Sequence, residues 1–218
     1  MNNEDISLIT ALIMFLSIVY INIARKNSAI IVSYTLQSIA LAGLLINEAL
    51  NESSFEKWLL VFIILLVKVI ITPQIFWRFL QNQKQNFSDV KYLNTPLTLF
   101  MLILITFFAQ SPFLSPLTNV LFHNQLPVVS TLLISSIIMS FFIAINRKGA
   151  FSQIIGILSL ENAIFAFGIF LETKQSISLE IGIIFDVLLW VIISSFYIKT
   201  IYSHFKSLDV TKLKELSR

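Results

Sequence analysis

Three ionisable side chains lie inside long apolar segments of this sequence. Lys68 ends the run Leu65-Leu-Val-Lys68, Glu161 ends Gly156-Ile-Leu-Ser-Leu-Glu161, and Asp186 ends Ile181-Gly-Ile-Ile-Phe-Asp186. A charged group at the centre of a bilayer costs about 2.5–3.5 kcal/mol on the translocon scale, so such groups usually face protein or water and serve a function. Burial disfavours the charged forms of amines and carboxyls alike, which brings proton exchange within reach near neutral pH. These three residues therefore predict a proton relay.

Polar neighbours extend two of these positions. Thr72 lies one turn after Lys68 on the same helix face. Pro73 has no N–H, so it leaves one backbone acceptor free beside Lys68. Asn162 directly follows Glu161 and enlarges the polar patch there.

Simpler explanations stay open for each residue. Lys68 and Glu161 also fit a buried structural ion pair, although such pairs are not especially stabilising compared with apolar packing. Asp186 would be an interfacial residue if its helix began later, and Glu180 fits the outer interface. Tyr34 reads as an interfacial anchor or as packing.

The composition indicates a membrane protein. The 218 residues are 56% hydrophobic and 12% charged, whereas a soluble domain carries about 25% charged residues. Apolar residues fill whole blocks rather than one face, as lipid-facing helices require. The sequence has no Cys and two His far apart, so we expect no metal site and no cofactor. No soluble-enzyme motif occurs, and the charges flank apolar blocks, which favours a lipid bilayer over nucleic acid as the partner.

Seven apolar blocks approach the length of about 20 residues that a helix needs to cross a bilayer. They lie near 6–24, 28–50, 57–80, 94–111, 126–145, 150–172 and 178–203. Lys and Arg divide twelve to two between the two sides, which predicts an outside N-terminus and an inside C-terminus. The sequence thus predicts an all-α integral membrane protein of about seven transmembrane helices, in the cytoplasmic (inner) membrane.

A faint internal repeat relates the two halves of the chain. Ser28-Ala-Ile-Ile31 aligns with Ser152-Gln-Ile-Ile155, and at the same shift Gln37 takes the position of Glu161. Either a parallel three-plus-one-plus-three duplication or chance similarity between apolar segments accounts for this. The duplication divides the chain into a first three-helix unit (1–80), a linking helix with an outer loop (81–125), and a second three-helix unit with a cytoplasmic tail (126–218).

Several stretches resemble a known family. Asn146–Phe165, Leu179–Asp186 and Phe205–Val210 resemble the hydrogenase-4 component E family, which is related to subunit K of NADH–quinone oxidoreductase. Lys68–Pro73 is similar to the Lys-to-Pro segment of that family. The resemblance implies a non-catalytic subunit of a group 4 hydrogenase or complex I-like assembly, with antiporter-like proton-pumping subunits as partners. In subunit K, acids on two successive membrane helices belong to the proton pathway; Glu161 matches the first, and Asp186 replaces the second as Asp rather than Glu.

Three functions follow from these observations. The leading hypothesis is a subunit that passes protons within the membrane through Lys68, Glu161 and Asp186. The second is a SWEET-like transporter of small solutes, whose helix plan is similar, although a central Lys with two acids suits protons better than a neutral sugar. The third is a purely structural scaffold subunit.

Overall fold

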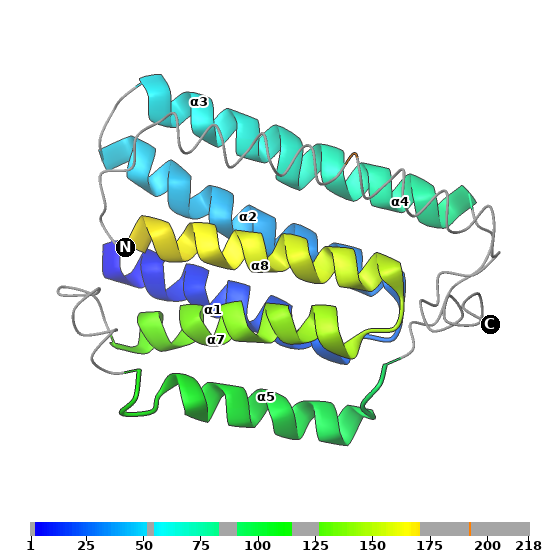
Figure 1. The fold of residues 1–218 in the computed structure, drawn as a ribbon. Coiled ribbons are helices and arrows are strands. Elements are labelled where there is room, and N and C mark those ends of the chain that lie inside the picture. The colour runs from blue at the N-terminus through cyan, green and yellow to red at the C-terminus, as the bar shows by residue number, and fades with distance from the viewer. Residues whose placement is uncertain (1–2, 52–54, 83–90, 115–126, 171–191, 193–218) are drawn as a thin grey trace.

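The computed structural model describes residues 3–51, 55–82, 91–114, 127–170 and position 192. Within these residues the chain forms helices and no strand. The helices are α1 (Asn3–Ile23), α2 (Asn27–Asn51), α3 (Phe55–Ile64), the π-helix η1 (Leu65–Ile71), α4 (Thr72–Asn82), α5 (Thr95–Ala109), α7 (Pro127–Asn146) and α8 (Ala150–Phe170). The segments α3, η1 and α4 follow one another without a break and form one rod (Figure 1).

Five helices in the described part of the chain are long and apolar enough to cross a membrane. They span Asp5–Ile23, Asn27–Asn51, Lys57–Arg78, Pro127–Asn146 and Ala150–Phe170, close to five of the seven predicted spans. The all-helical, multi-pass character predicted from the sequence is therefore present. The seventh predicted span, 178–203, lies outside the described residues except for position 192.

Helix α5 is shorter than the predicted span 94–111. It begins after Asn94, whose side-chain oxygen accepts a hydrogen bond from the N–H of Leu97 (3.1 Å), and it has 15 residues. At a rise of about 1.5 Å per residue α5 is about 22 Å long, against a hydrocarbon core of about 30 Å. The polar run Gln110-Ser111-Pro112 follows its end and cannot extend an apolar helix.

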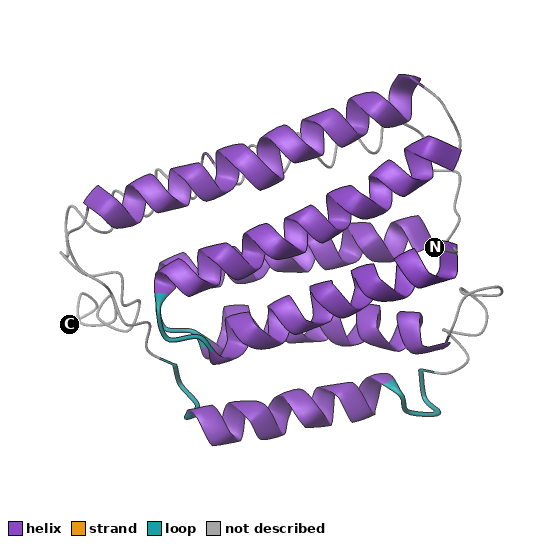
Figure 2. Ribbon diagram, turned by 180° about the vertical axis from the view of Figure 1, so that it is seen from behind, coloured by secondary structure: helices purple, strands orange, loops and turns teal. Residues whose placement is uncertain are grey.

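Helices α1, α2, α7 and α8 form the centre of the bundle, with α7 packed on α8 and α1 on both α2 and α7. The rod of α3, η1 and α4 packs against α2, whereas α5 packs against α7 on the other side (Figures 1 and 2). Gly156 brings α8 close to α7: a Cβ at this position would lie 2.8 Å from Ile143 Cγ2 and 3.1 Å from the backbone nitrogen of Ala144. The absence of a side chain at Gly156 thus fixes the spacing of these two helices.

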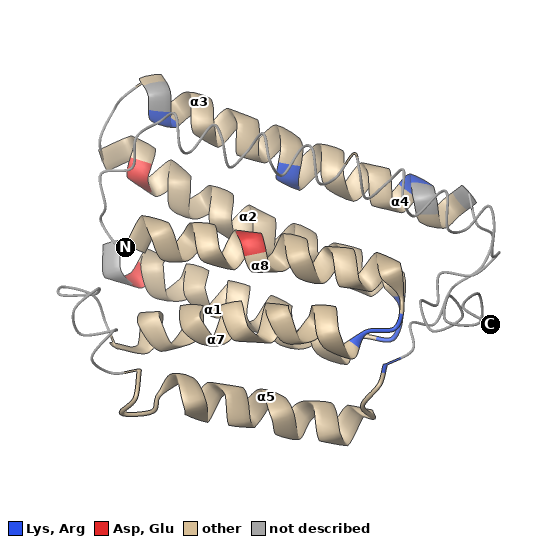
Figure 3. Cartoon of the chain, in the orientation of Figure 1, with Lys and Arg blue, Asp and Glu red and all other residues tan. Residues whose placement is uncertain are grey.

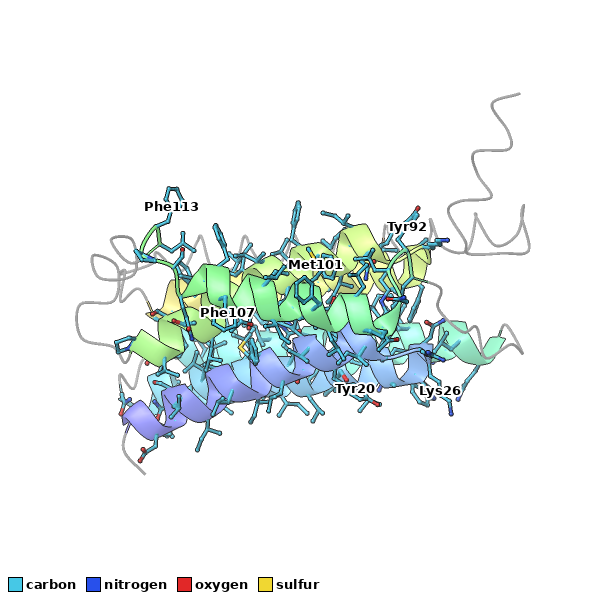
Figure 4. The ribbon with its side chains drawn as sticks, turned by 90° about the horizontal axis from the view of Figure 1, so that it is seen from below. Tyr20, Lys26, Tyr92, Met101, Phe107 and Phe113 are labelled. Carbon is cyan, nitrogen blue, oxygen red and sulfur yellow. The ribbon has the colours of Figure 1, made fainter. Side chains whose placement is uncertain are left out.

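Large apolar side chains point outward from the bundle. Leu16 on α1 is 59% exposed and Phe107 on α5 is 68% exposed. A soluble protein buries such groups, whereas a lipid-facing surface consists of them. Figure 4 shows Tyr92 and Lys26 at one end of the helices and Phe113 at the other.

Positive charge gathers at one end of the bundle, at the α1–α2 and α7–α8 turns (Figure 3). We call this the basic end; it carries Arg25, Lys26, Lys91, Arg147 and Lys148. The Arg147 side chain is buried and donates to the carbonyls of Ala24 (2.8 Å) and Ile21, and Lys91 Nζ donates to the carbonyl of Ile23 (2.7 Å). Two cations thus satisfy carbonyls that the end of α1 leaves without helical partners.

Candidate functional site

Lys68 lies in the π-helical turn in the middle of the rod. The backbone N–H of Thr72 bonds the carbonyl of Val67, five residues back, and the Thr72 hydroxyl donates to the same oxygen at 2.8 Å. Pro73, which has no N–H to donate, follows at once. Single π-helical turns inside α-helices are frequent at functional sites, and this turn places the Lys68 side chain in the protein interior, only 1% exposed.

The Lys68 ammonium group reaches α8 at the middle of that helix. Its Nζ donates to Asn162 Oδ1 at 2.8 Å and lies 3.4 Å from Glu161 Oε1. The ring of Phe165 lies on a third side, with its centroid 5.7 Å from Nζ. The ammonium group has three N–H donors, so an amide oxygen, a carboxylate and an aromatic face together surround it. Figure 3 shows the basic position midway along the rod and the acidic position midway along α8.

Two residues of α2 complete the site. Asn162 Nδ2 donates to Ser38 Oγ at 3.0 Å, and Gln37 Nε2 donates to the carbonyl of Ser159 at 3.0 Å. The rod, α8 and α2 are therefore joined by hydrogen bonds at a single level. We call Lys68, Glu161, Asn162, Ser38 and Gln37 the Lys68 cluster.

The cluster differs in detail from the sequence prediction. Glu161 and Lys68 are brought together as predicted, and Asn162 contacts Lys68 directly rather than only extending the patch. Thr72 bonds the backbone of the π-turn, so its hydroxyl stabilises the turn that carries Lys68. Gln37 binds the α8 backbone next to Glu161. Asp186 lies outside the described residues.

The sequence left Tyr34 open as an interfacial anchor or a packing residue, and the structure shows that it packs in the interior. It is fully buried, not interfacial, and its hydroxyl faces Ser38, Thr72 and Asn162, although no described group lies in hydrogen-bonding geometry to it. Its spacing to Gln37 and Ser38, three and four residues on, places all three on one face of α2. That spacing was the signal that the sequence offered.

Glu161 differs from the rest of the cluster in its exposure. Its side chain is 23% exposed, against 1% for Lys68. The carboxylate therefore lies between the enclosed ammonium group and the surface of the bundle. Chemically, the arrangement is an amine and a carboxyl group in contact in a poorly solvated place.

Among the described residues, no three His, Cys, Asp or Glu side chains gather into a group that could hold a metal ion. No protein-family model, no curated protein and no solved structure matches this chain.

Proposed function

We propose that this chain is a non-catalytic membrane subunit that passes protons within the bilayer, as part of a redox-driven assembly of the group 4 hydrogenase or complex I-like kind. The observation that carries the proposal is the Lys68 ammonium group, 1% exposed, in contact with Glu161 and Asn162 midway along membrane-length helices. Ionisable pairs at this depth are expensive and mark proton or ion pathways.

The unequal exposure of the pair supports transfer toward a neighbour. Glu161 keeps part of its side chain at the bundle surface, at the midpoint of α8, where lipid would be a poor environment for a carboxylate. A second membrane subunit with polar groups at the same depth would cover it and accept the proton. Antiporter-like subunits, which carry ionisable residues within the membrane, fit this requirement.

Two further observations fit the predicted topology of seven spans with the N-terminus outside. The basic end holds Arg25, Lys26 and Arg147 together, as expected for the cytoplasmic side of the inner membrane. Ser38 and Asn162 occupy equivalent positions in the proposed repeat, and they are hydrogen-bonded to each other at 3.0 Å. A pseudo-two-fold axis between α2 and α8 would bring equivalent positions together in this way.

The test is Glu161→Gln in the assembled complex, with Glu48→Gln as the control. Glu48 forms a partly exposed pair with Lys57 (3.8 Å), and pairs near the surface contribute little. We expect Glu161→Gln to abolish redox-coupled proton transport while the subunit still assembles, and Glu48→Gln to leave transport unchanged. Normal transport by Glu161→Gln would overturn the proposal.

A structural scaffold is the second candidate, because the Lys68 cluster joins three separate segments of the chain through hydrogen bonds. A solute transporter has less support. Helices α1, α2, α7 and α8 are each continuous, whereas transporter sites commonly use interrupted helices.

A further inference from the structure

Eight buried side-chain oxygens on α1, α2, α7 and α8 have no hydrogen-bond partner among the described residues. They belong to Asn22, Asn27, Tyr34, Gln37, Ser136, Ser140, Ser152 and Ser159. Buried polar groups are nearly always bonded, and inside a membrane each unsatisfied group is expensive. Bound water is the usual partner of buried polar groups that protein does not satisfy.

Other hydroxyl groups of the same helices do find partners. Ser130 donates to the carbonyl of Pro127 (2.8 Å), Ser135 to that of Thr131 (2.7 Å) and Thr35 to that of Ile31 (2.9 Å). Bonding to the preceding turn is thus available to a hydroxyl in this bundle. The four unpartnered serines do not make this bond to the preceding turn.

The packing of α7 on α8 brings two of these serines to one level. Gly156 faces Ile143 and Ala144, and the two helices run in opposite directions. Ser140 comes three residues before Ile143 on α7, and Ser159 comes three residues after Gly156 on α8. Because the helices are antiparallel, these two serines lie at the same level. Both side chains are fully buried.

Two more of these residues, Asn22 and Gln37, use their amide nitrogens to bond the backbone of α7 and α8. Asn22 Nδ2 donates to the carbonyl of Met139 at 3.4 Å, next to Ser140. Gln37 Nε2 donates to the carbonyl of Ser159. The side chain of Gln37 and Ser159 therefore meet at the Lys68 cluster, and Ser140 is level with them on α7. Asn22 lies between Ile21 and Ile23, close to the basic end, and reaches from there to the carbonyl of Met139.

Two further residues with unpartnered oxygens, Ser152 and Asn27, lie between this level and the basic end. Ser152 precedes Ser159 by two turns on the same face of α8, about 10 Å along the axis. Helix α2 runs parallel to α8, and the bond from Gln37 to Ser159 sets their register. Asn27, the first residue of α2, therefore lies level with the start of α8, about one turn beyond Ser152.

We propose that these side chains line a file of bound water molecules that connects the Lys68 cluster to the basic end of the bundle. Waters about 2.8 Å apart would cover the interval from Ser152 to Ser159 with three or four molecules. Serine and asparagine side chains can donate and accept hydrogen bonds, so protons can pass along such a file. The inference rests on the proposed function, for which it supplies the route from the cytoplasm to Lys68.

The sequence has no Cys, so a single introduced cysteine can be followed without background. Ser152→Cys and Ser159→Cys change one atom each, and Ser135→Cys is the matched control because Ser135 is equally buried but its hydroxyl is bonded. The full chain in sealed membrane vesicles is treated with Ag⁺ on one side of the membrane. Thiols that have not reacted with Ag⁺ are then alkylated after denaturation and counted by mass spectrometry. If Ser159→Cys fails to accumulate, Ser140→Cys at the same level takes its place.

We expect Ser152→Cys and Ser159→Cys to react at least about tenfold faster than Ser135→Cys, because only a hydrated thiol ionises readily. The reaction should be fast when Ag⁺ is on the side of the basic end. Rates equal to that of Ser135→Cys, or reaction from the opposite side alone, would overturn the route. The proton relay is tested separately by Glu161→Gln. Fast reaction of the introduced cysteines together with normal proton transport by Glu161→Gln would support the water file and contradict the relay. Slow reaction of the cysteines together with abolished transport would support the relay and contradict the water file.

Discussion

The contact between Lys68 and Glu161 allows a double-mutant cycle that separates a relay from a scaffold. The variants are Lys68→Met, Glu161→Gln and the two together. At 3.4 Å and an effective dielectric constant of about 20, the two charges attract each other by about 5 kcal/mol. Breaking a buried pair from one side typically destabilises a protein by about 3–5 kcal/mol, because the other charge remains without its partner.

The three variants should differ in stability. Lys68→Met removes the donor of both Glu161 and Asn162, so we expect a destabilisation near the top of that range, about 4–5 kcal/mol. Glu161→Gln keeps the 2.8 Å bond to Asn162 and leaves an amide oxygen near Nζ, so about 2–3 kcal/mol is expected. In the double variant no charge stays buried at the contact, and its stability should return to within about 1 kcal/mol of the parent.

Two measurements complete the cycle. The free energy of unfolding is obtained from reversible denaturant titrations in mixed micelles, followed by the fluorescence of the three tryptophans. Proton transport is measured with a pH-sensitive dye in vesicles that contain the assembled complex. The relay predicts that the double variant regains stability while transport stays abolished, because no group remains at either position to carry the proton.

Two results would refute this reasoning. If the double variant regains both stability and transport, the pair is a structural element and the scaffold hypothesis is correct. If the two single substitutions have additive effects on stability, the charges do not interact in the membrane as the structure places them.

The packing and the ends of the helices give further predictions. Gly156→Val should destabilise the bundle by about 1–3 kcal/mol through overpacking, whereas Gly43→Ala, where a Cβ meets nothing within 4 Å, should be neutral or slightly stabilising; thermal unfolding in detergent compares the two. Arg147→Gln should lower stability by about 2–3 kcal/mol by removing charged hydrogen bonds to the end of α1, while Lys148→Gln at the same turn should have little effect in the same assay. Asn94→Ala should cost about 1 kcal/mol through loss of the α5 cap, and an unchanged midpoint would show that the cap does not contribute.

Most of the helical architecture followed from the lengths of the apolar blocks. A lipid environment forces each crossing segment to satisfy its own backbone and to present apolar side chains outward, so α2 and α8 were predictable to within about two residues. The end of α5 was predicted near position 111 and lies at Ala109, directly before the polar Gln110 and Ser111. The repeat could be seen only as a pattern, since apolar segments resemble one another by composition.

The candidate site was predictable in its charged members and not in its geometry. Charge within apolar segments identified Lys68 and Glu161 because lipid excludes it. The π-turn has no local sequence rule, and it depends on how the rod packs against α2 and α8. Hydropathy also cannot tell a buried tyrosine from an interfacial one, which is why both readings of Tyr34 stayed open. Hydropathy likewise could not predict that Arg147 is buried. It lies in the turn between α7 and α8, and its side chain bonds carbonyls at the end of α1.

The bond lengths within the Lys68 cluster set the direction in which the proposed relay would pass protons. The short contact of Nζ is to Asn162 (2.8 Å), an amide that cannot take a proton and that Ser38 holds in place. The longer contact, 3.4 Å, is to Glu161, which can accept a proton and reaches the bundle surface. A charge-assisted hydrogen bond of ordinary length requires these two groups to approach by about 0.6 Å, a shift within the range of side-chain rotation. Under the proposed function, the amide would hold the ammonium group while the carboxylate moves, and protons that reach Lys68 would leave through Glu161.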